Sequence, residues 1–229
     1  MFNRSTSNSQ KYWMTNKPVT INKDYTLKLI ATGYTSYNYA LNCYNTFTNN
    51  GNVIIDNYSA LGLRNNISNN GTMDINNGGL GLYGNATLNN TGTITFKGSS
   101  SIYIASNATL TNTSTGTIDI SNITDLSGCG NKGTFTLKGG STFILPKSIS
   151  IPNSNNFKIT LNGTDNKPVN IVIPKSCKYI KYIYNNNNDV LLFNLIKIAT
   201  GLIFNGEREN VNFSWQTSVD NEYESVDEG

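Results

Sequence analysis

The sequence predicts an all-β fold in which the chain winds into a parallel β-helix, a solenoid of stacked coils. Apolar residues alternate with polar ones in short pairs, which is the pattern of a strand with one buried face. From Asn45 to Leu145 a single template recurs about every 20 residues: a lone apolar residue, an Asn/Thr run, a glycine and two apolar-x-apolar pairs. Such a unit can bury its inner face only against its neighbours, so the repetition indicates stacked coils.

Aligning the units on this template places their apolar residues in columns. The lone apolar residue is Phe47, Ile67, Leu88 or Leu110. The first pair is Val53/Ile55, Met73/Ile75, Ile94/Phe96, Ile118/Ile120 or Phe135/Leu137. The second pair is Leu61/Leu63, Leu80/Leu82, Ile102/Ile104 or Phe143/Leu145. We expect three short strands per turn, with these residues pointing inward.

An antiparallel meander is the alternative architecture. Each unit has a glycine before its first pair, and Asn-Gly is a strong hairpin signal. These glycines are Gly51, Gly71, Gly92, Gly116 and Gly133. A meander would not require three matching apolar clusters per unit, which favours the coil. In a coil, glycine permits the positive φ needed where the chain turns a corner.

Residues 1–44 are predicted to form an N-terminal arm and an irregular first coil. Residues 1 to about 16 are polar, and we expect Tyr12 or Trp13 to dock them onto that coil. Residues 18–29 carry two alternating apolar pairs, which begin the solenoid. Residues 31–44 are rich in tyrosine and are either a loop or an irregular face. Their aromatic cluster either caps the end or forms a binding platform.

Residues 45–178 are predicted to form the regular repeats. The pattern blurs between Ile120 and Phe135, where we expect a bulge, a skipped strand or a changed cross-section. Beyond this point, residues 143–148 are echoed by 171–176, and 135–137 by 159–161. The solenoid is therefore expected to continue to at least Ser176.

Residues 179–229 are predicted to form a C-terminal cap of β-hairpins that covers the last coil.

The charge is unevenly distributed along the chain. Residues 1–206 hold 16 Lys and Arg against 7 Asp and Glu, whereas residues 207–229 hold one Arg against 7 acids. The acidic tail is either a solvated segment or one that docks on the basic body of the same or the next molecule.

Composition restricts the chemistry available to the chain. Histidine is absent, which excludes histidine-based acid/base catalysis and histidine metal ligands. The three cysteines, Cys43, Cys129 and Cys177, have no C-x-x-C spacing, so we expect no zinc site. We expect each cysteine to act as a small hydrophobic residue. The alternative is one disulfide and one free thiol. No run is apolar enough to span a membrane, and residues 1–14 lack the apolar core of a signal peptide. We expect no cofactor, no bound metal and no membrane insertion. Export would use another route, or the chain would be part of a longer exported precursor.

The residues between the apolar pairs are predicted to point outward in ladders with a spacing of about 4.8 Å per coil. One outward column contains Asp74, Thr95, Asp119 and Thr136, and the next contains Asn76 and Lys97. These six residues are the candidate binding site. Asp74 and Asp119 would lie two coils apart, about 9.6 Å, near the upper limit for the paired carboxylates of an inverting glycosidase. A solvated strand face also explains two such aspartates, and we expect no catalytic residues.

The outward pairs Thr93/Thr95 and Thr134/Thr136 resemble the threonine ladders of ice-binding proteins. In the predicted column Asp74 and Asp119 interrupt that ladder, which argues against ice binding. The lysines are not interleaved with aromatic residues, so nucleic acid is not an expected partner.

The segments Asn85–Phe96 and Asn107–Ile120 follow the pattern N-A-T-L-x-N-x-G-T-I-x-I, the second with a two-residue insertion. This pattern resembles the repeats of bacterial autotransporter passenger domains and of filamentous-haemagglutinin-like adhesins, over roughly residues 45–176. The resemblance implies a right-handed parallel β-helix displayed at a cell surface or outer membrane, with roles in adhesion, aggregation, host contact and virulence. It supplies no catalytic residues to carry over.

Two functions follow as expectations. The first is a secreted, cell-surface adhesin whose Asn/Thr-rich faces and loops bind a glycan or a protein of a host or neighbouring cell. The second is a structural subunit that stacks end to end into a filament or surface layer, because a solenoid has two different ends. A viral fibre and a glycan-cleaving β-helix are further alternatives.

Overall fold

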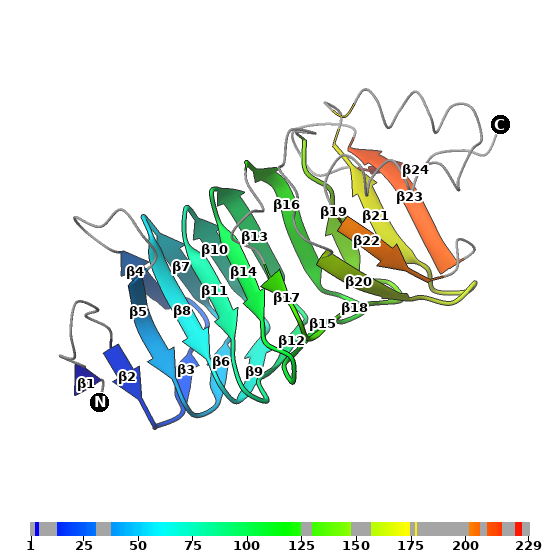
Figure 1. Cartoon of the computed structure of the whole chain (residues 1–229). Coiled ribbons are helices and arrows are strands. Elements are labelled where there is room, and N and C mark those ends of the chain that lie inside the picture. Colours follow the sequence, from blue (N-terminus) through cyan, green and yellow to red (C-terminus); the bar gives the residue numbers. More distant parts are fainter. Residues whose placement is uncertain are drawn as a thin grey trace.

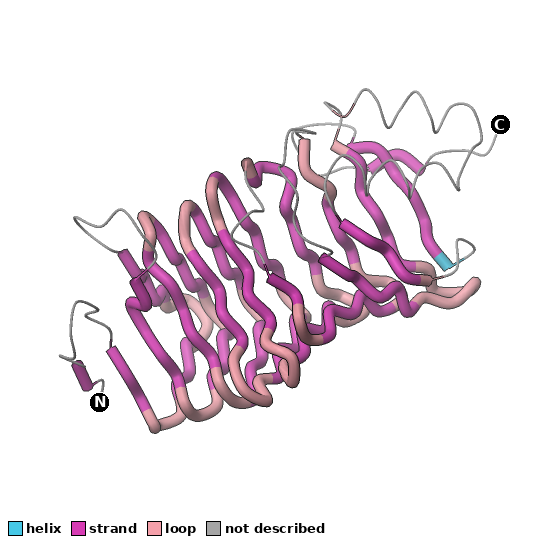
Figure 2. Tube along the Cα trace, viewed as in Figure 1, coloured by secondary structure: helices cyan, strands magenta, loops and turns pink. Residues whose placement is uncertain are grey.

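The computed structural model describes residues 3–4, 13–30, 38–124, 130–147, 157–174, 177, 202–206, 210–216 and 223–225. These residues form an elongated parallel β-solenoid, which confirms the predicted fold class (Figure 1). Strands and loops make up almost all of the described chain (Figure 2).

The described strands belong to three sheets, named A, B and C, and each sheet is given below in its spatial order. Sheet A contains β1 (Asn3–Arg4), β2 (Trp13–Thr15), β5 (Asn38–Cys43), β8 (Ser59–Leu63), β11 (Gly79–Leu82), β14 (Ser101–Ile104) and β17 (Gly130–Asn131). Sheet B contains β22 (Leu202–Asn205), β20 (Phe157–Asn162), β18 (Thr134–Lys138), β15 (Thr109–Asn112), β12 (Thr87–Asn90), β9 (Asn66–Asn69), β6 (Phe47–Asn49) and β3 (Val19–Ile21). Sheet C contains β24 (Tyr223–Ser225), β23 (Val211–Gln216), β21 (Val169–Ile173), β19 (Thr142–Ile144), β16 (Thr117–Ile123), β13 (Thr93–Gly98), β10 (Thr72–Asn76), β7 (Asn52–Asp56) and β4 (Thr26–Ile30).

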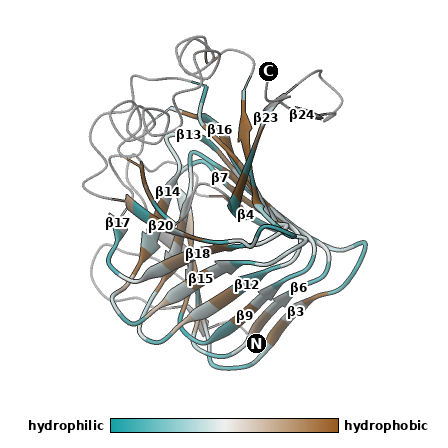
Figure 3. Ribbon diagram, turned by 90° about the vertical axis from the view of Figure 1, so that its right-hand side faces the viewer, coloured by the Kyte–Doolittle hydropathy of each residue, from teal (hydrophilic) through white to brown (hydrophobic). Residues whose placement is uncertain are grey.

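One coil takes the chain through sheet B, then sheet C, then sheet A. Strands β3, β4 and β5 form the first coil, and the next four coils follow the same order up to β17. Neighbouring coils pair in parallel, as in β7, β10 and β13. Figure 3 shows the sheets surrounding a common interior. The predicted three strands per turn are therefore present, and the meander is excluded.

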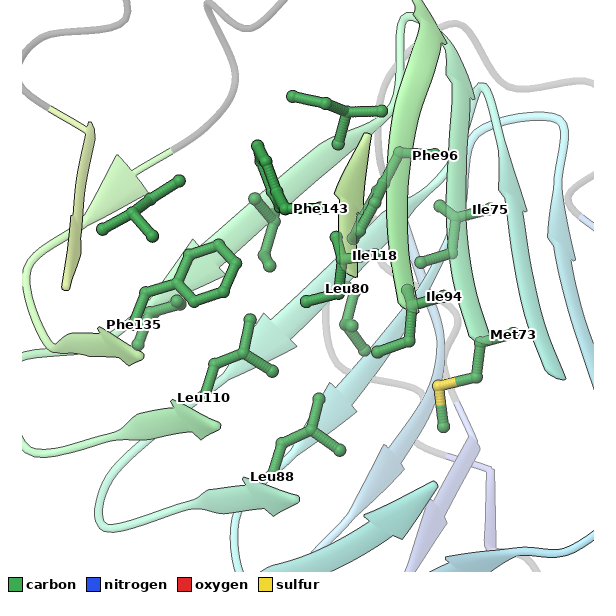
Figure 4. Packing of buried hydrophobic residues seen from close by; sticks show 14 of the residues in the cluster. Met73, Ile75, Leu80, Leu88, Ile94, Phe96, Leu110, Ile118, Phe135 and Phe143 are labelled. Atoms are coloured by element: carbon green, nitrogen blue, oxygen red, sulfur yellow. The ribbon is translucent and has the colours of Figure 1, made fainter. Parts of the chain in front are cut away.

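The interior of the solenoid is filled by the apolar columns read from the sequence. Met73 and Ile75 of β10 are completely buried, and Ile94 and Phe96 of β13 stack on them in register. Figure 4 shows these side chains converging with those of sheet B, among them Leu88 and Leu110. Each such side chain stabilises the fold by about 1.5–3 kcal/mol relative to an exposed position. Stacking of identical apolar positions is thus the main force holding the coils together.

A buried row of asparagines lies at the corner between sheets B and C. Asn49, Asn69, Asn90 and Asn112 follow one another in register and have no exposed surface. Each of the first three donates from Nδ2 to Oδ1 of the next, over 2.7, 2.6 and 2.7 Å. Each of the four also donates to a main-chain carbonyl of the next coil, such as that of Thr117 from Asn90. Because buried polar groups are costly unless paired, this row fixes the register of the corner.

Glycines at the same corner are required by close packing between coils. A Cβ built on Gly71 would lie 2.0 Å from the carbonyl oxygen of Gly51, and one on Gly92 would lie 2.0 Å from that of Gly71. The expected positive φ is wrong for Gly51, Gly71, Gly92 and Gly116, since none of the four has one. Positive φ occurs at Asn57, Tyr58, Asn77 and Gly98 between sheets C and A, and at Gly84 between sheets A and B. Between sheets B and C it occurs at Asp24 and Gly140, outside the regular corner glycines.

The alignment of the fifth unit with the others was wrong by one strand. Phe135 pairs with Leu110 in sheet B, and Phe143 pairs with Ile118 in sheet C. The reason is that the fifth coil has a third strand, β17, of two residues only, in a stretch without apolar alternation. Gly133 consequently precedes a sheet B strand and lies against the carbonyls of Ala105 and Ala108. A small apolar cavity of about 20 Å³ lies here between Phe135, Phe143 and their neighbours.

Of the three irregularities considered between Ile120 and Phe135, the structure shows a bulge, which begins at Ile120. The pairing of β13 with β16 shifts between Thr95 and Lys97, so that Lys97 lies opposite Asn122 instead of Ser121. Residues 125–129, including Cys129, lie outside the described part. The two predicted echoes are also confirmed, because Leu137 pairs with Leu161 and Phe143 with Ile171.

At the two ends the sheets extend beyond the regular repeats. Strand β2 pairs in parallel with β5 and in antiparallel fashion with β1, so part of the N-terminal segment joins sheet A. At the other end β22 and β23 continue sheets B and C in parallel, past residue 178. Among the described strands at this end, β23 and β24 are the pair with the antiparallel arrangement expected of a hairpin cap. Residues 178–201 and most of the acidic tail lie outside the described residues.

Candidate functional site

The predicted site residues Asp74, Thr95 and Asp119 lie in one outward column of sheet C. Asp74 is opposite Thr95, and Thr95 is opposite Asp119. All three side chains are half-buried. The two aspartates are therefore two coils apart, as the sequence predicts.

Neighbouring groups already interact with these carboxylates. Lys97 Nζ lies 3.6 Å from Asp74 Oδ1, with both side chains nearly half exposed. Asp119 Oδ1 accepts a hydrogen bond from the backbone N–H of Ser121 at 2.7 Å. An exposed ion pair of this kind contributes about 0–1 kcal/mol. Sheet C thus presents a solvated face of mixed charge.

Asn76 and Lys97 form the predicted second column on sheet C. They lie opposite one another, and Asn76 Nδ2 donates to Asp56 Oδ1 at 3.1 Å. The column continues to Asn122 across the bulge, whereas Ser121 is buried.

Thr136 does not belong to this site. It lies on β18 of sheet B, between Thr111 and Thr160, whereas Asp119 is followed in its own column by Ile144. The cause is the third strand of the fifth coil, β17, which is so short that the repeat pattern does not reveal it. The strands after it therefore belong to a different sheet from the one that the pattern predicts. The structure therefore brings together five of the six predicted residues and places the sixth on a different face.

The outward surface of sheet B forms a second candidate site, named here the threonine face. It consists of two parallel rows that run across five successive coils. One row is Thr46, Asn66, Thr87, Thr109 and Thr134, and the other is Thr48, Ser68, Asn89, Thr111 and Thr136. All ten residues are uncharged, and all are exposed or half-buried.

A third candidate site is a row of three tyrosines and an arginine on sheet A, of which the sequence indicated only Tyr44, within the tyrosine-rich residues 31–44. The row is Tyr44, Arg64, Tyr83 and Tyr103, from four successive coils. The Arg64 guanidinium carbon lies 5.0 Å from the ring centres of both Tyr44 and Tyr83. The rings of Tyr83 and Tyr103 are 5.4 Å apart and inclined by 33°. We call this set the tyrosine–arginine row.

Glycines position the tyrosine–arginine row. The ring of Tyr83 lies over Gly81, where any Cβ would approach it to 2.3 Å, and the ring of Tyr103 lies beside Gly130. The sequence contains a signal for this row, because Tyr44, Arg64 and Tyr83 each directly follow the last inward residue of a sheet A strand. This column lies outside the positions between apolar pairs, from which the other outward columns were predicted.

The described cysteines have no reactive character. Cys43 and Cys177 are buried free thiols. Burial raises the pKa of the Cys43 thiol to about 12 and that of Cys177 to about 11, the latter against a small opposing effect of Lys147. Because the thiolate is the nucleophile and metal ligand, both behave as small apolar residues near neutral pH, as predicted.

Comparisons of the chain with protein families, curated proteins and solved structures found no match. Within the described ranges, no group of three His, Cys, Asp or Glu residues could hold a metal ion. A search of the same residues found no helix with the length and apolar character to cross a membrane.

Proposed function

We propose that this protein is a non-catalytic, adhesin-like rod displayed outside the cell, and that it binds glycans through the tyrosine–arginine row. The observation that carries the proposal is the alignment of Tyr44, Arg64, Tyr83 and Tyr103 along four successive coils. The two polar columns on sheet C, which contain Asp74, Asn76, Thr95, Lys97 and Asp119, then serve as an additional polar surface of the rod.

The chemistry of the row suits a sugar ligand. Tyrosine rings offer an apolar face and a polar hydroxyl, and a guanidinium stacked between them holds them in a fixed arrangement. Tyr44 keeps 40 % of its surface exposed, and Arg64 is exposed as well. A pyranose ring has the matching character, with apolar C–H faces and a rim of hydroxyls. The row spans several coils, so it favours a chain of sugars over a single one.

Replacing Arg64 with alanine tests the proposal. We expect binding of the full chain on a glycan array to weaken about tenfold or more, the loss typical of one central contact. Asp119→Asn on sheet C is the matched control and should bind normally. A chain that binds no glycan, or an Arg64→Ala variant that is folded and binds as the parent does, would refute the proposal.

End-to-end self-assembly is the second candidate, and the N-terminal end of the solenoid favours it. Strands β3 and β4 are the edges of sheets B and C, so one side of each backbone has no strand partner among the described residues. Val19, Ile21 and Leu27 are only partly buried there, and Tyr25 is 68 % exposed. Apolar surface next to open strand edges is a template for association.

Electron microscopy and sedimentation of the full chain at low and high salt test this second candidate. Filaments that shorten with salt, and that are lost on deletion of residues 216–229, would support docking of the acidic tail on the basic body of the next molecule. A monomer at all concentrations and salt levels would exclude it.

A further inference from the structure

The threonine face on sheet B has a chemistry different from that of the other two faces. We propose that it binds ice, by holding water molecules in an ordered, lattice-like layer. The sequence argued against ice binding because Asp74 and Asp119 were expected to interrupt the threonine ladder. The structure places both aspartates on sheet C and leaves the threonine face without a charged residue from Thr46 to Thr136.

The first argument is regularity. The residues of each row lie directly opposite one another in parallel strands, for example Thr87 with Thr109 and Thr109 with Thr134. Parallel strands lie about 4.8 Å apart, and alternate residues of one strand about 6.7 Å apart. The face is therefore a two-dimensional array, seen in Figure 3 as the neighbouring strands β6, β9, β12, β15 and β18. A ligand can contact all positions at once only if it has a repeat of similar spacing.

The second argument is that the hydroxyls of the face are available. No hydrogen bond joins the side chains of Thr87, Thr109, Thr111, Thr134 and Thr136 to other described residues. Threonines at the neighbouring corner are different. Thr91 donates to the carbonyl of Asn69, and Thr113 to the carbonyl of Asn90. The corner threonines thus serve the fold, whereas the hydroxyls of these five threonines of the threonine face have no partner among the described residues.

The third argument is preorganisation. Threonine is β-branched and has a restricted χ1, so an array of threonines loses little side-chain entropy when it meets a rigid partner. Each side chain presents a hydroxyl that hydrogen-bonds water beside a methyl group that water must surround. Alternating hydroxyls and methyls on a fixed array can order the first water layer, while a charged side chain would orient water around itself.

The composition of the face favours ice over a polysaccharide surface. Its ten residues include no aromatic side chain that could stack on sugar rings, whereas the tyrosine–arginine row lies on sheet A. The face is also bounded by charge, because Lys138 and Lys158 follow on β18 and β20. The ice-binding surface is thereby confined to the coils from β6 to β18.

Thermal hysteresis of the full chain, together with the shape of ice crystals grown in its presence, tests the proposal. The parent chain should open a gap between melting and freezing temperatures and produce faceted crystals. Thr111→Lys, on the fourth of the five coils of the face, and Thr136→Lys, on the fifth, should each lose most of the hysteresis. Thr95→Lys is the matched control, since Thr95 is an equally half-buried outward threonine on sheet C, and it should retain the parent activity.

Melting temperatures of the three variants establish that each is folded. The proposal is overturned if the parent chain shows no hysteresis and no crystal shaping, or if Thr95→Lys loses as much activity as Thr111→Lys. Pull-down on insoluble cellulose or chitin that depends on Thr111, without hysteresis, would assign the face to a polysaccharide instead. Arg64→Ala should leave the hysteresis unchanged, which separates this proposal from glycan binding at the tyrosine–arginine row.

Discussion

Gly92→Ala is expected to destabilise the solenoid by about 3 kcal/mol or more, as an overpacked backbone contact does when it has no flexible neighbour to displace. The new Cβ would lie 2.0 Å from the carbonyl oxygen of Gly71 and 2.8 Å from the carbonyl carbon of Asn70. Both belong to the backbone of the preceding coil, and the Gly71 carbonyl accepts the N–H of Thr93. Relief would require neighbouring coils to separate. Urea denaturation of the parent chain and of Gly92→Ala measures the difference in their free energies of unfolding.

Gly84→Ala is the matched control for this substitution. Gly84 has a φ of +60°, and a Cβ there would meet no atom within 4 Å. Its replacement should cost about 1–2 kcal/mol, the penalty of a left-handed backbone for an L-residue. Equal losses for the two variants would mean that conformational freedom, and not contact between coils, explains the corner glycines.

The fold could be predicted from the sequence because inward apolar residues alternate with outward residues along each strand of the solenoid. Met73 and Ile75 flank one outward residue, and the same spacing returns at Ile94 and Phe96, so the inward columns follow directly. Sheet membership is less well encoded. Phe135 and Leu137 fit the pattern of sheet B and of sheet C equally well, and only the length of the preceding strand decides between them.

This ambiguity also determined how well the candidate site could be predicted. Asp74, Thr95 and Asp119 lie before the irregular strand β17, and their column is confirmed. Thr136 lies after it and was placed in the wrong sheet. The tyrosine–arginine row does not appear among the residues between apolar pairs, because Tyr44, Arg64 and Tyr83 each lie one position beyond the last inward residue of a sheet A strand.

The buried asparagines illustrate a different limit. The sequence shows Asn49, Asn69 and Asn90 two residues before a glycine, yet an Asn-rich run next to a turn is usually solvated. Their burial follows from the glycines, which let successive coils approach closely enough for one side-chain amide to reach the next. Two features that look independent in the sequence are therefore parts of one corner.

Asn90→Leu is the second substitution with a large expected effect, a loss of about 3–5 kcal/mol. Leucine removes the acceptor of Asn69 Nδ2 and the donor to Asn112 Oδ1, and it leaves the carbonyls of Thr117 and Gly92 without their side-chain donor. Each buried group left unpaired costs about 1–3 kcal/mol. Asn89→Leu is the control on the adjacent residue. Asn89 is exposed on the threonine face, so its replacement should change stability by no more than about 0.5 kcal/mol.

The energies of the row should also be coupled between coils. The hydrogen bond from Asn69 to Asn90 is lost in either single variant, so it is counted twice when the two losses are added. Asn69→Leu combined with Asn90→Leu should therefore cost less than the sum, by about 0.5–3 kcal/mol, because two adjacent leucines also pack on each other. Additive losses would show that each asparagine stabilises only the turn of its own coil. A coupled loss would show that the row acts as one element, in which each asparagine depends on the asparagine of the next coil.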